Sequence, residues 1–294
     1  MRFAVEAWAP DYGAPAVDEH DPVRRGRVDA RVWITGEDGV ARPGVAASYA
    51  AGVVACQASR ARVDRCEVRR TLFSAAPQLE EVATRYGAYR PHAVAAEAVD
   101  ALLSELHQAM GLLEAEVAAR SADGADLVVV DGPLTRLPAM DCAVGYVKTH
   151  HRSYLPAELS GVVAALRPGQ RTPLFVTSAR WSRHAWYARL PDAGAAAERD
   201  AHPLTGVIRG EVSGDVATAE AARLADLATA VLPAYASTAH KDPRAPQNLV
   251  PIGELERCLR HQLGDSTLLY RSLRVAARPA GAGVASLPRP TAAG

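Results

Sequence analysis

The sequence predicts a mixed α/β protein. Three strand-like segments follow one another between residues 28 and 73, and a long amphipathic helix follows them. Strand and helix patterns then alternate as far as residue 263. A chain that begins with consecutive strands and continues with alternating helices and strands is typical of a mixed sheet flanked by helices. We therefore expect one domain over residues 1–275 and a disordered tail over 276–294, where Ala, Gly, Pro and Arg dominate.

The first third of the chain predicts strands that are neighbours along the sequence. Residues 2–9 alternate in polarity as a strand would, and the residues after them, rich in Pro, Asp and Arg, predict a loop as far as Val28. Apolar and β-branched residues then predict strands over 28–35, 45–58 and 63–73. Because the connections between these three are short, we expect the strands to run antiparallel.

The long helix, over about 93–120, carries an acid at the edge of its apolar face. Apolar side chains recur at steps of four and three from Val99 to Val117, which defines one face of a helix. At 100° per residue, Glu114 lies roughly 60° from the centre of this face and Glu116 roughly 100°. Glu114 can therefore point into a site, whereas we expect Glu116 to meet water.

A second acid follows the most apolar strand pattern of the chain. Leu127 and the three valines after it predict a central strand buried on both faces, and this strand ends at Asp131-Gly132-Pro133. A carboxylate at the end of a buried strand is costly unless a cation or hydrogen-bond donors satisfy it. Asp131 is either a turn cap that accepts backbone N–H groups or part of a functional site.

Basic side chains follow closely. A short strand beginning at Gly145 runs into Lys148, His150 and Arg152. His151 is adjacent to His150, and neighbouring strand residues point to opposite faces, so at most one of the two joins a site. An acid at one strand end and a basic cluster soon afterwards suit a metal-assisted site for a phosphate-bearing substrate, in which these cations contact phosphate.

The remaining chain contributes one more candidate acid. We expect strands over 172–177, 186–190 and 206–212, an acidic loop over 192–203, and helices over 217–232 and 252–263. On the last helix Glu256 lies roughly 55° from the apolar side, while Glu254 is nearly opposite and should be solvated. In this fold Asp131, Glu114 and Glu256 could converge at one end of the sheet.

Composition excludes several classes of protein. Lys plus Arg and Asp plus Glu number 33 each, so no overall positive charge marks a nucleic-acid binder, and any basic surface must be local. The four cysteines form no C-x-x-C pair, which favours a reduced compartment over a zinc site or disulfide framework. Neither a signal peptide nor an apolar run of about 20 residues occurs, so we expect a cytoplasmic protein without a membrane span. No phosphate-binding G-x-x-x-x-G-K-[ST] loop and no G-x-S-x-G nucleophile motif occurs.

These motifs, in their order, resemble the NurA family of DNA-end-processing nucleases. The matching features are Glu114 on its helix, the strand ending in Asp131-Gly132-Pro133-Leu134, the strand Gly145-Tyr146-Val147-Lys148, and the segment 251–257 with Glu256. The resemblance covers most of residues 28–275. It implies a ribonuclease H-like fold, a mixed sheet flanked by helices, and a metal-dependent DNA nuclease that acts on single strands or duplex ends in DNA repair.

The resemblance also implies a site with Mn²⁺ or Mg²⁺ held by carboxylates. Its catalytic and metal-binding residues would be Asp21, Glu114, Asp131 and Glu256, and its substrate-binding residues would be Lys148, His150 and Arg152. Asp131 would bridge two metal ions. The family's first ligand ends an N-terminal strand, whereas no apolar strand precedes Asp21. Glu6, on the earlier strand, is the alternative, or the ligand is missing.

Two further expectations concern partners. The family resemblance implies a homodimer that works with a HerA-type hexameric motor ATPase on DNA. Trp181 and Trp186 could supply a dimer contact or stack on unpaired bases, although aromatic residues are more often core. Because the N-terminal motif is altered, a second hypothesis is a catalytically weak or inactive relative that acts as a DNA- or partner-binding scaffold.

Overall fold

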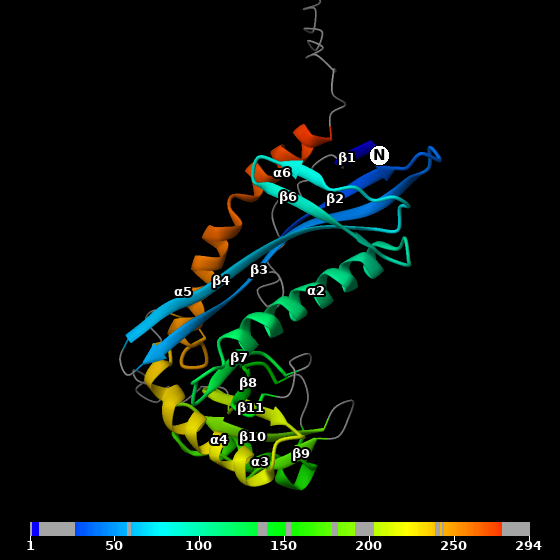
Figure 1. The fold of residues 1–294 in the computed structure, drawn as a ribbon. Helices are drawn as coiled ribbons and strands as arrows, with labels where there is room; N and C mark the ends of the chain where they lie inside the picture. The colour runs from blue at the N-terminus through cyan, green and yellow to red at the C-terminus, as the bar shows by residue number, and fades with distance from the viewer. Residues whose placement is uncertain are drawn as a thin grey trace, which may run out of the picture. The chain divides into compact units, whose positions relative to one another are not determined.

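The structure, a computed structural model, is a mixed α/β protein with two mixed β-sheets and flanking helices (Figure 1). It describes residues 2–5, 27–57, 60–134, 140–150, 154–177, 182–191, 203–238, 242 and 244–277. Tertiary contacts divide the chain into two compact units. Unit 1 comprises Met1–Ala50, Val68–Met110 and Arg260–Gly294, and unit 2 comprises Ala51–Glu67 and Gly111–Leu259. Residues 278–294 of the predicted tail lie outside the described residues.

The first sheet has six strands in the order β1-β2-β3-β4-β6-β5. The strands are β1 (Arg2–Val5), β2 (Arg27–Thr35), β3 (Ala41–Gln57), β4 (Arg60–Ser74), β5 (Val82–Thr84) and β6 (Gly87–Ala93). Strand β2 pairs antiparallel with both β1 and β3, whereas β4 and β6 run parallel. The three sequential strands that the sequence predicts are confirmed, and β3 and β4 extend further than predicted. The sequence analysis did not predict β5 and β6.

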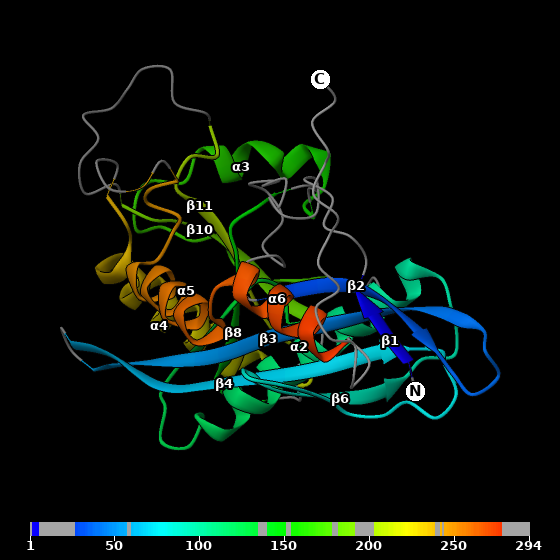
Figure 2. The same cartoon turned by 90° about the horizontal axis from the view of Figure 1, so that it is seen from above.

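Unit 1 has an aliphatic core that a C-terminal helix helps to build. Helix α6 (Ser266–Ala276) contacts β1 and β5 of the six-stranded sheet (Figure 2). Its Leu273 packs into the cluster around Ile34 and Leu72, all fully buried. The Asp265 side chain accepts a hydrogen bond from the Leu268 amide at 2.9 Å, which caps the first turn of the helix.

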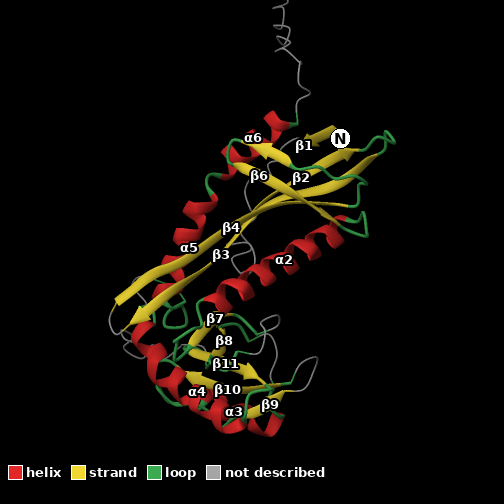
Figure 3. Ribbon diagram, in the orientation of Figure 1, coloured by secondary structure: helices red, strands yellow, loops and turns green. Residues whose placement is uncertain are grey.

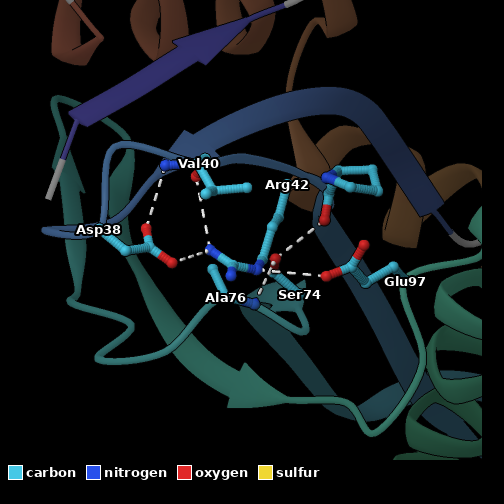
Figure 4. A network of polar contacts seen from close by, with 7 residues as sticks. Asp38, Val40, Arg42, Ser74, Ala76 and Glu97 are labelled. Carbon is cyan, nitrogen blue, oxygen red and sulfur yellow. Dashed lines mark hydrogen bonds and ion pairs between the residues drawn. The ribbon is translucent and has the colours of Figure 1, made fainter.

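A polar network fixes the turn between β2 and β3 (Figure 4). The Arg42 guanidinium lies 2.8 Å from Asp38 Oδ2 and donates from Nε to Glu97 Oε1 at 3.2 Å. Beside it, the Ser74 hydroxyl donates to the Pro43 carbonyl oxygen at 2.8 Å. The pKa of Asp38 is lowered, first by the Val40 amide and then by Arg42. Because the two acids of the network are exposed, its ion pairs orient the turn and contribute little to stability.

The second sheet has five strands in the order β7-β8-β11-β10-β9. The strands are β7 (Val128–Asp131), β8 (Ala143–Val147), β9 (Phe175–Thr177), β10 (Arg183–Arg189) and β11 (Val207–Ser213). Strands β7 and β8 are parallel, and the other pairs are antiparallel. The prediction that the strand before Asp131 is central was therefore wrong, since β7 lies at an edge. Only one side of this strand packs on the core, and two of its three valines are only partly buried.

One face of this second sheet packs against helix α4 (Thr218–Val231), which contacts β8 and β10 (Figure 3). The core beneath it includes Tyr146 and Trp186, both fully buried. A Cβ atom on Gly210 would lie only 2.2 Å from Trp186 Cζ2, so the indole occupies the space that a side chain would take. Burial of Trp186 overturns its suggested roles in base stacking and dimer contact, while Trp181 lies outside the described residues.

The other helices agree broadly with their predictions. Helices α2 (Val99–Arg120) and α5 (Val250–Leu263) match the expected segments, and the short helix α3 (Ser160–Ala164) was not predicted. Two 3₁₀ turns, η2 (Ala157–Leu159) and η3 (Leu232–Tyr235), complete the described elements. In the part of the chain that the structure describes, no helix is both long and apolar enough to cross a membrane.

Candidate functional site

Asp131 lies at the edge of the unit 2 sheet where two parallel strands end. It is the last residue of β7 and pairs with Tyr146 of β8. Lys148 follows β8 directly, and its Nζ lies 2.9 Å from Asp131 Oδ1. The two side chains are 18% exposed for Lys148 and 29% for Asp131. Because the carboxyl ends of parallel strands meet at one edge, the sequence brings an acid and a cation together there.

Glu114 joins this corner from helix α2. The pKa of its carboxyl is raised to about 7, mainly because the surrounding protein removes water and secondly because of the Asp131 charge. The residue as a whole is nevertheless exposed on the surface of α2, so solvent screening reduces the effect of this shift. The predicted exposures of the two acids were wrong, because Glu114 is exposed and Glu116 is half-buried. The influence of Asp131 still places the Glu114 carboxyl within electrostatic range of that acid. Glu116 instead forms an ion pair with Arg120, one turn along the helix.

Tyr146 forms the buried floor of the site. It is fully buried, and its hydroxyl donates a hydrogen bond to the Gln247 carbonyl oxygen at 2.7 Å. Burial, and then the negative charge of Asp131, raise the pKa of the Tyr146 phenol. The phenol therefore stays neutral and fixes the strand edge that carries Asp131, rather than exchanging protons at neutral pH.

The turn after Asp131 is held in place by backbone contacts. The Gly132 amide donates to the Tyr146 carbonyl oxygen at 2.9 Å, and Gly132 has φ 114°, a conformation that favours glycine. A Cβ atom on Gly145 would lie 2.9 Å from the Gly132 carbonyl oxygen, so the turn lies directly over β8. Gly145 thus leaves room for the turn to approach β8, and Gly132 supplies the positive φ that the turn after Asp131 needs.

A buried charge network, which sequence reasoning missed, supports the same turn. Arg183 Nη2 donates to the Leu134 carbonyl oxygen at 3.0 Å, and its Nη1 donates to Glu211 Oε2 at 3.2 Å. Arg209 Nη2 donates to Glu211 Oε1 at 2.6 Å and stacks 4.3 Å above the Tyr154 ring. The available signal was Arg209 and Glu211 on alternate positions of an otherwise apolar strand, which predicts that both face the same side.

The remaining candidate residues are His150, Glu256, Asp21 with its alternative Glu6, and Arg152. His150 Nε2 donates to the Val207 carbonyl oxygen at 2.9 Å, and its ring contacts Tyr187, so its described contacts are with β10 and β11. Glu256 is half-buried on α5. Asp21, its alternative Glu6, and Arg152 lie outside the described residues. Within the described ranges no group of three or more His, Cys, Asp or Glu could hold a metal ion, so Glu256 does not complete such a group with Glu114 and Asp131.

The described corner is therefore a pair of carboxylates with one lysine. Carboxylate oxygens are the ligands that Mg²⁺ and Mn²⁺ prefer, and the raised pKa of Glu114 shows that negative charge there lacks full compensation. The donor chemistry fits a divalent cation, with further ligands needed from elsewhere. No protein-family model matches the chain, and no curated protein matches it significantly.

Proposed function

We propose that this chain is a metal-dependent DNA nuclease of NurA type that hydrolyses phosphodiester bonds in single strands or at duplex ends. The observation that carries the proposal is the pair Glu114 and Asp131, whose charges interact at a strand end beside Lys148. Carboxylates that can hold a divalent cation and a lysine that can contact a phosphate are elements that metal-assisted phosphodiester hydrolysis uses. The mixed sheet of unit 2, with an acid ending β7, supports the further proposal of a ribonuclease H-like plan.

In this proposal the described side chains hold the metal, contact the phosphate and accept a proton. Glu114 and Asp131 would hold Mn²⁺ or Mg²⁺ through their oxygens, with Asp21 as the further ligand that the family resemblance implies. The metal would supply activation of water and stabilisation of the leaving oxygen. Lys148 neutralises Asp131 in the free protein and is placed to contact a backbone phosphate. With a pKa of about 7, Glu114 can accept a proton near neutral pH.

Cleavage of labelled single-stranded DNA in the presence of Mn²⁺ tests the proposal. We expect Asp131→Asn and Glu114→Gln to lower the rate by about 100-fold or more, because each removes a charged oxygen group at the reacting phosphate. Glu116→Gln is the matched control, since Glu116 lies on the same helix and pairs with Arg120. Equal degradation by wild type and Asp131→Asn would identify a contaminating nuclease and overturn the assignment.

A second candidate function is a catalytically weak or inactive NurA-like scaffold that binds DNA or a protein partner. It is favoured by one observation: among the described residues the two acids acquire no third that would complete a metal site. Fluorescence anisotropy with labelled single-stranded DNA in a chelator distinguishes the two. Binding that survives Asp131→Asn, without turnover under any divalent metal, supports the scaffold.

The family resemblance also leads us to propose a cytoplasmic homodimer that cooperates with a HerA-type hexameric motor. Trp186 is buried within the core of unit 2, so a dimer contact must involve other residues. Light scattering of the purified chain tests the dimer, and a monomeric mass at micromolar concentration contradicts it. Copurification of a hexameric ATPase from the native cell tests the motor.

A further inference from the structure

Two cysteines that lie far apart in the sequence meet in unit 2. The Sγ atoms of Cys66, on β4, and Cys258, on α5, lie 3.7 Å apart, although 192 positions separate them. Both side chains are half-buried, and all four cysteines are free thiols. The other two have different surroundings, since Cys56 is exposed and interacts with the Tyr235 hydroxyl, and Cys142 precedes β8.

A glycine makes the close approach of the two thiols possible. Gly52 on β3 lies beneath them, and a Cβ atom there would be 2.9 Å from Leu255 Cδ1 and 3.2 Å from Cys66 Sγ. Leu255 precedes Cys258 by three positions, so both lie on the same side of α5. The helix is therefore seated on the β3–β4 hairpin by packing that does not depend on the sulfur atoms.

We propose that Cys66 and Cys258 form a reversible disulfide bond when the protein meets a disulfide oxidant such as oxidised glutathione. Closing the bond requires the sulfur atoms to approach by about 1.7 Å, a change that side-chain rotation can supply. One thiolate attacks glutathione disulfide and releases one glutathione thiol, and the second cysteine then attacks the mixed disulfide and releases the other. The protein loses two protons and two electrons, and one disulfide is reduced to two thiols. The inference is independent of the proposed nuclease activity.

The environment of Cys66 sets the pH range of the reaction. Loss of solvent, followed by the hydrogen bond and charge of Cys258, raises the pKa of the Cys66 thiol to about 11. Because the thiolate is the reactive form, exchange should be slow at neutral pH and faster as the pH rises. The geometry favours the intramolecular product once either cysteine has formed a mixed disulfide, since its partner is already in contact.

Oxidation of the full-length chain tests the inference. After incubation with oxidised glutathione at pH 8.5, Cys66 and Cys258 should no longer react with a thiol reagent, and neither should carry glutathione. Tryptic digestion without reductant should give a linked pair of the peptides Cys66–Arg69 and Cys258–Arg260, lighter than the two free peptides by two hydrogen atoms. Dithiothreitol should restore four thiols and remove the linked pair.

Two variants provide the controls. Cys142→Ser should retain the linked pair, and Cys258→Ser should lose it and leave Cys66 as a thiol or a glutathione adduct. Wild-type peptide mapping needs no variant, so poor folding of Cys258→Ser leaves the test intact. Separate glutathione adducts on Cys66 and Cys258, a link between two chains, or no oxidation of this pair at pH 8.5 would each overturn the inference.

Discussion

The pKa of Glu114 offers a direct test of the candidate site through the substitution Glu114→Gln. The folded protein raises this pKa from 4.5 to about 7, mainly by loss of solvent and secondly through Asp131. The protonated carboxyl is therefore favoured in the folded state. Its contribution to stability is fully present below about pH 4.5 and is lost as the pH rises to about 7. Glutamine stays neutral at every pH and lacks this dependence.

The size of the effect follows from the difference between the two pKa values. At about 1.4 kcal/mol per pH unit, that difference corresponds to at most about 3.5 kcal/mol in the free energy of unfolding. Because Glu114 contacts solvent, screening reduces the contribution, and we expect about 1 kcal/mol. Relative to wild type, Glu114→Gln should thus gain about 1 kcal/mol between pH 4.5 and pH 8.

Denaturant unfolding of both proteins, followed by circular dichroism at half-unit steps of pH, measures this gain. NMR titration of the Glu114 side-chain carboxyl carbon gives the pKa itself, and Asp131→Asn should lower it by removing the nearby negative charge. A stability difference that is constant from pH 4.5 to 8, together with a Glu114 pKa near 4.5, would refute the interaction between the two acids.

Two further predictions concern the packing of unit 2. Gly210→Ala should lower the free energy of unfolding by at least about 2 kcal/mol, because its Cβ would lie 2.2 Å from Trp186 Cζ2. Gly253→Ala is the matched control, since that Cβ meets nothing within 4 Å and should stabilise the helix by about 0.5–1 kcal/mol in the same denaturant titration. Glu211→Ala should cost about 3–5 kcal/mol by leaving two arginines without their acid, whereas Glu220→Ala, in an exposed ion pair, should change the unfolding midpoint little.

Much of the secondary structure could be predicted because its signals are local. The helix over 93–120 and the strand over 28–35 follow from periods of 3.6 and 2. The strand begins one residue earlier than predicted, and the helix begins six residues later, at Val99. The angular argument failed for the two acids of this helix, since Glu114 is exposed and Glu116 is half-buried, and Glu114 is distinguished by its interaction with Asp131. Asp131 could be selected because a carboxylate after a valine run needs a partner, and Lys148 supplies one.

Features that depend on contacts between distant segments could not be predicted. A run of valines indicates a strand without indicating its place in a sheet, which is why the edge position of β7 was missed. Arg183 reaches the turn after Asp131 from a strand about fifty residues later, and no local pattern signals this contact. Helix α6 was missed because its apolar face is short, although Asp265 before it is a suitable N-cap.

The ion pair between Asp131 and Lys148 does not decide between the two proposed functions. A partly exposed pair of this kind contributes about 0–1 kcal/mol, so a divalent cation or a phosphate could displace it at little cost. Lys148 therefore does not argue against a metal site. Holding a divalent cation with only two carboxylates is a more serious difficulty, because carboxylate ligands must offset its charge. A nuclease needs a further acid beside Glu114 and Asp131, whereas a scaffold does not. Displacement of Lys148 does not distinguish the two functions.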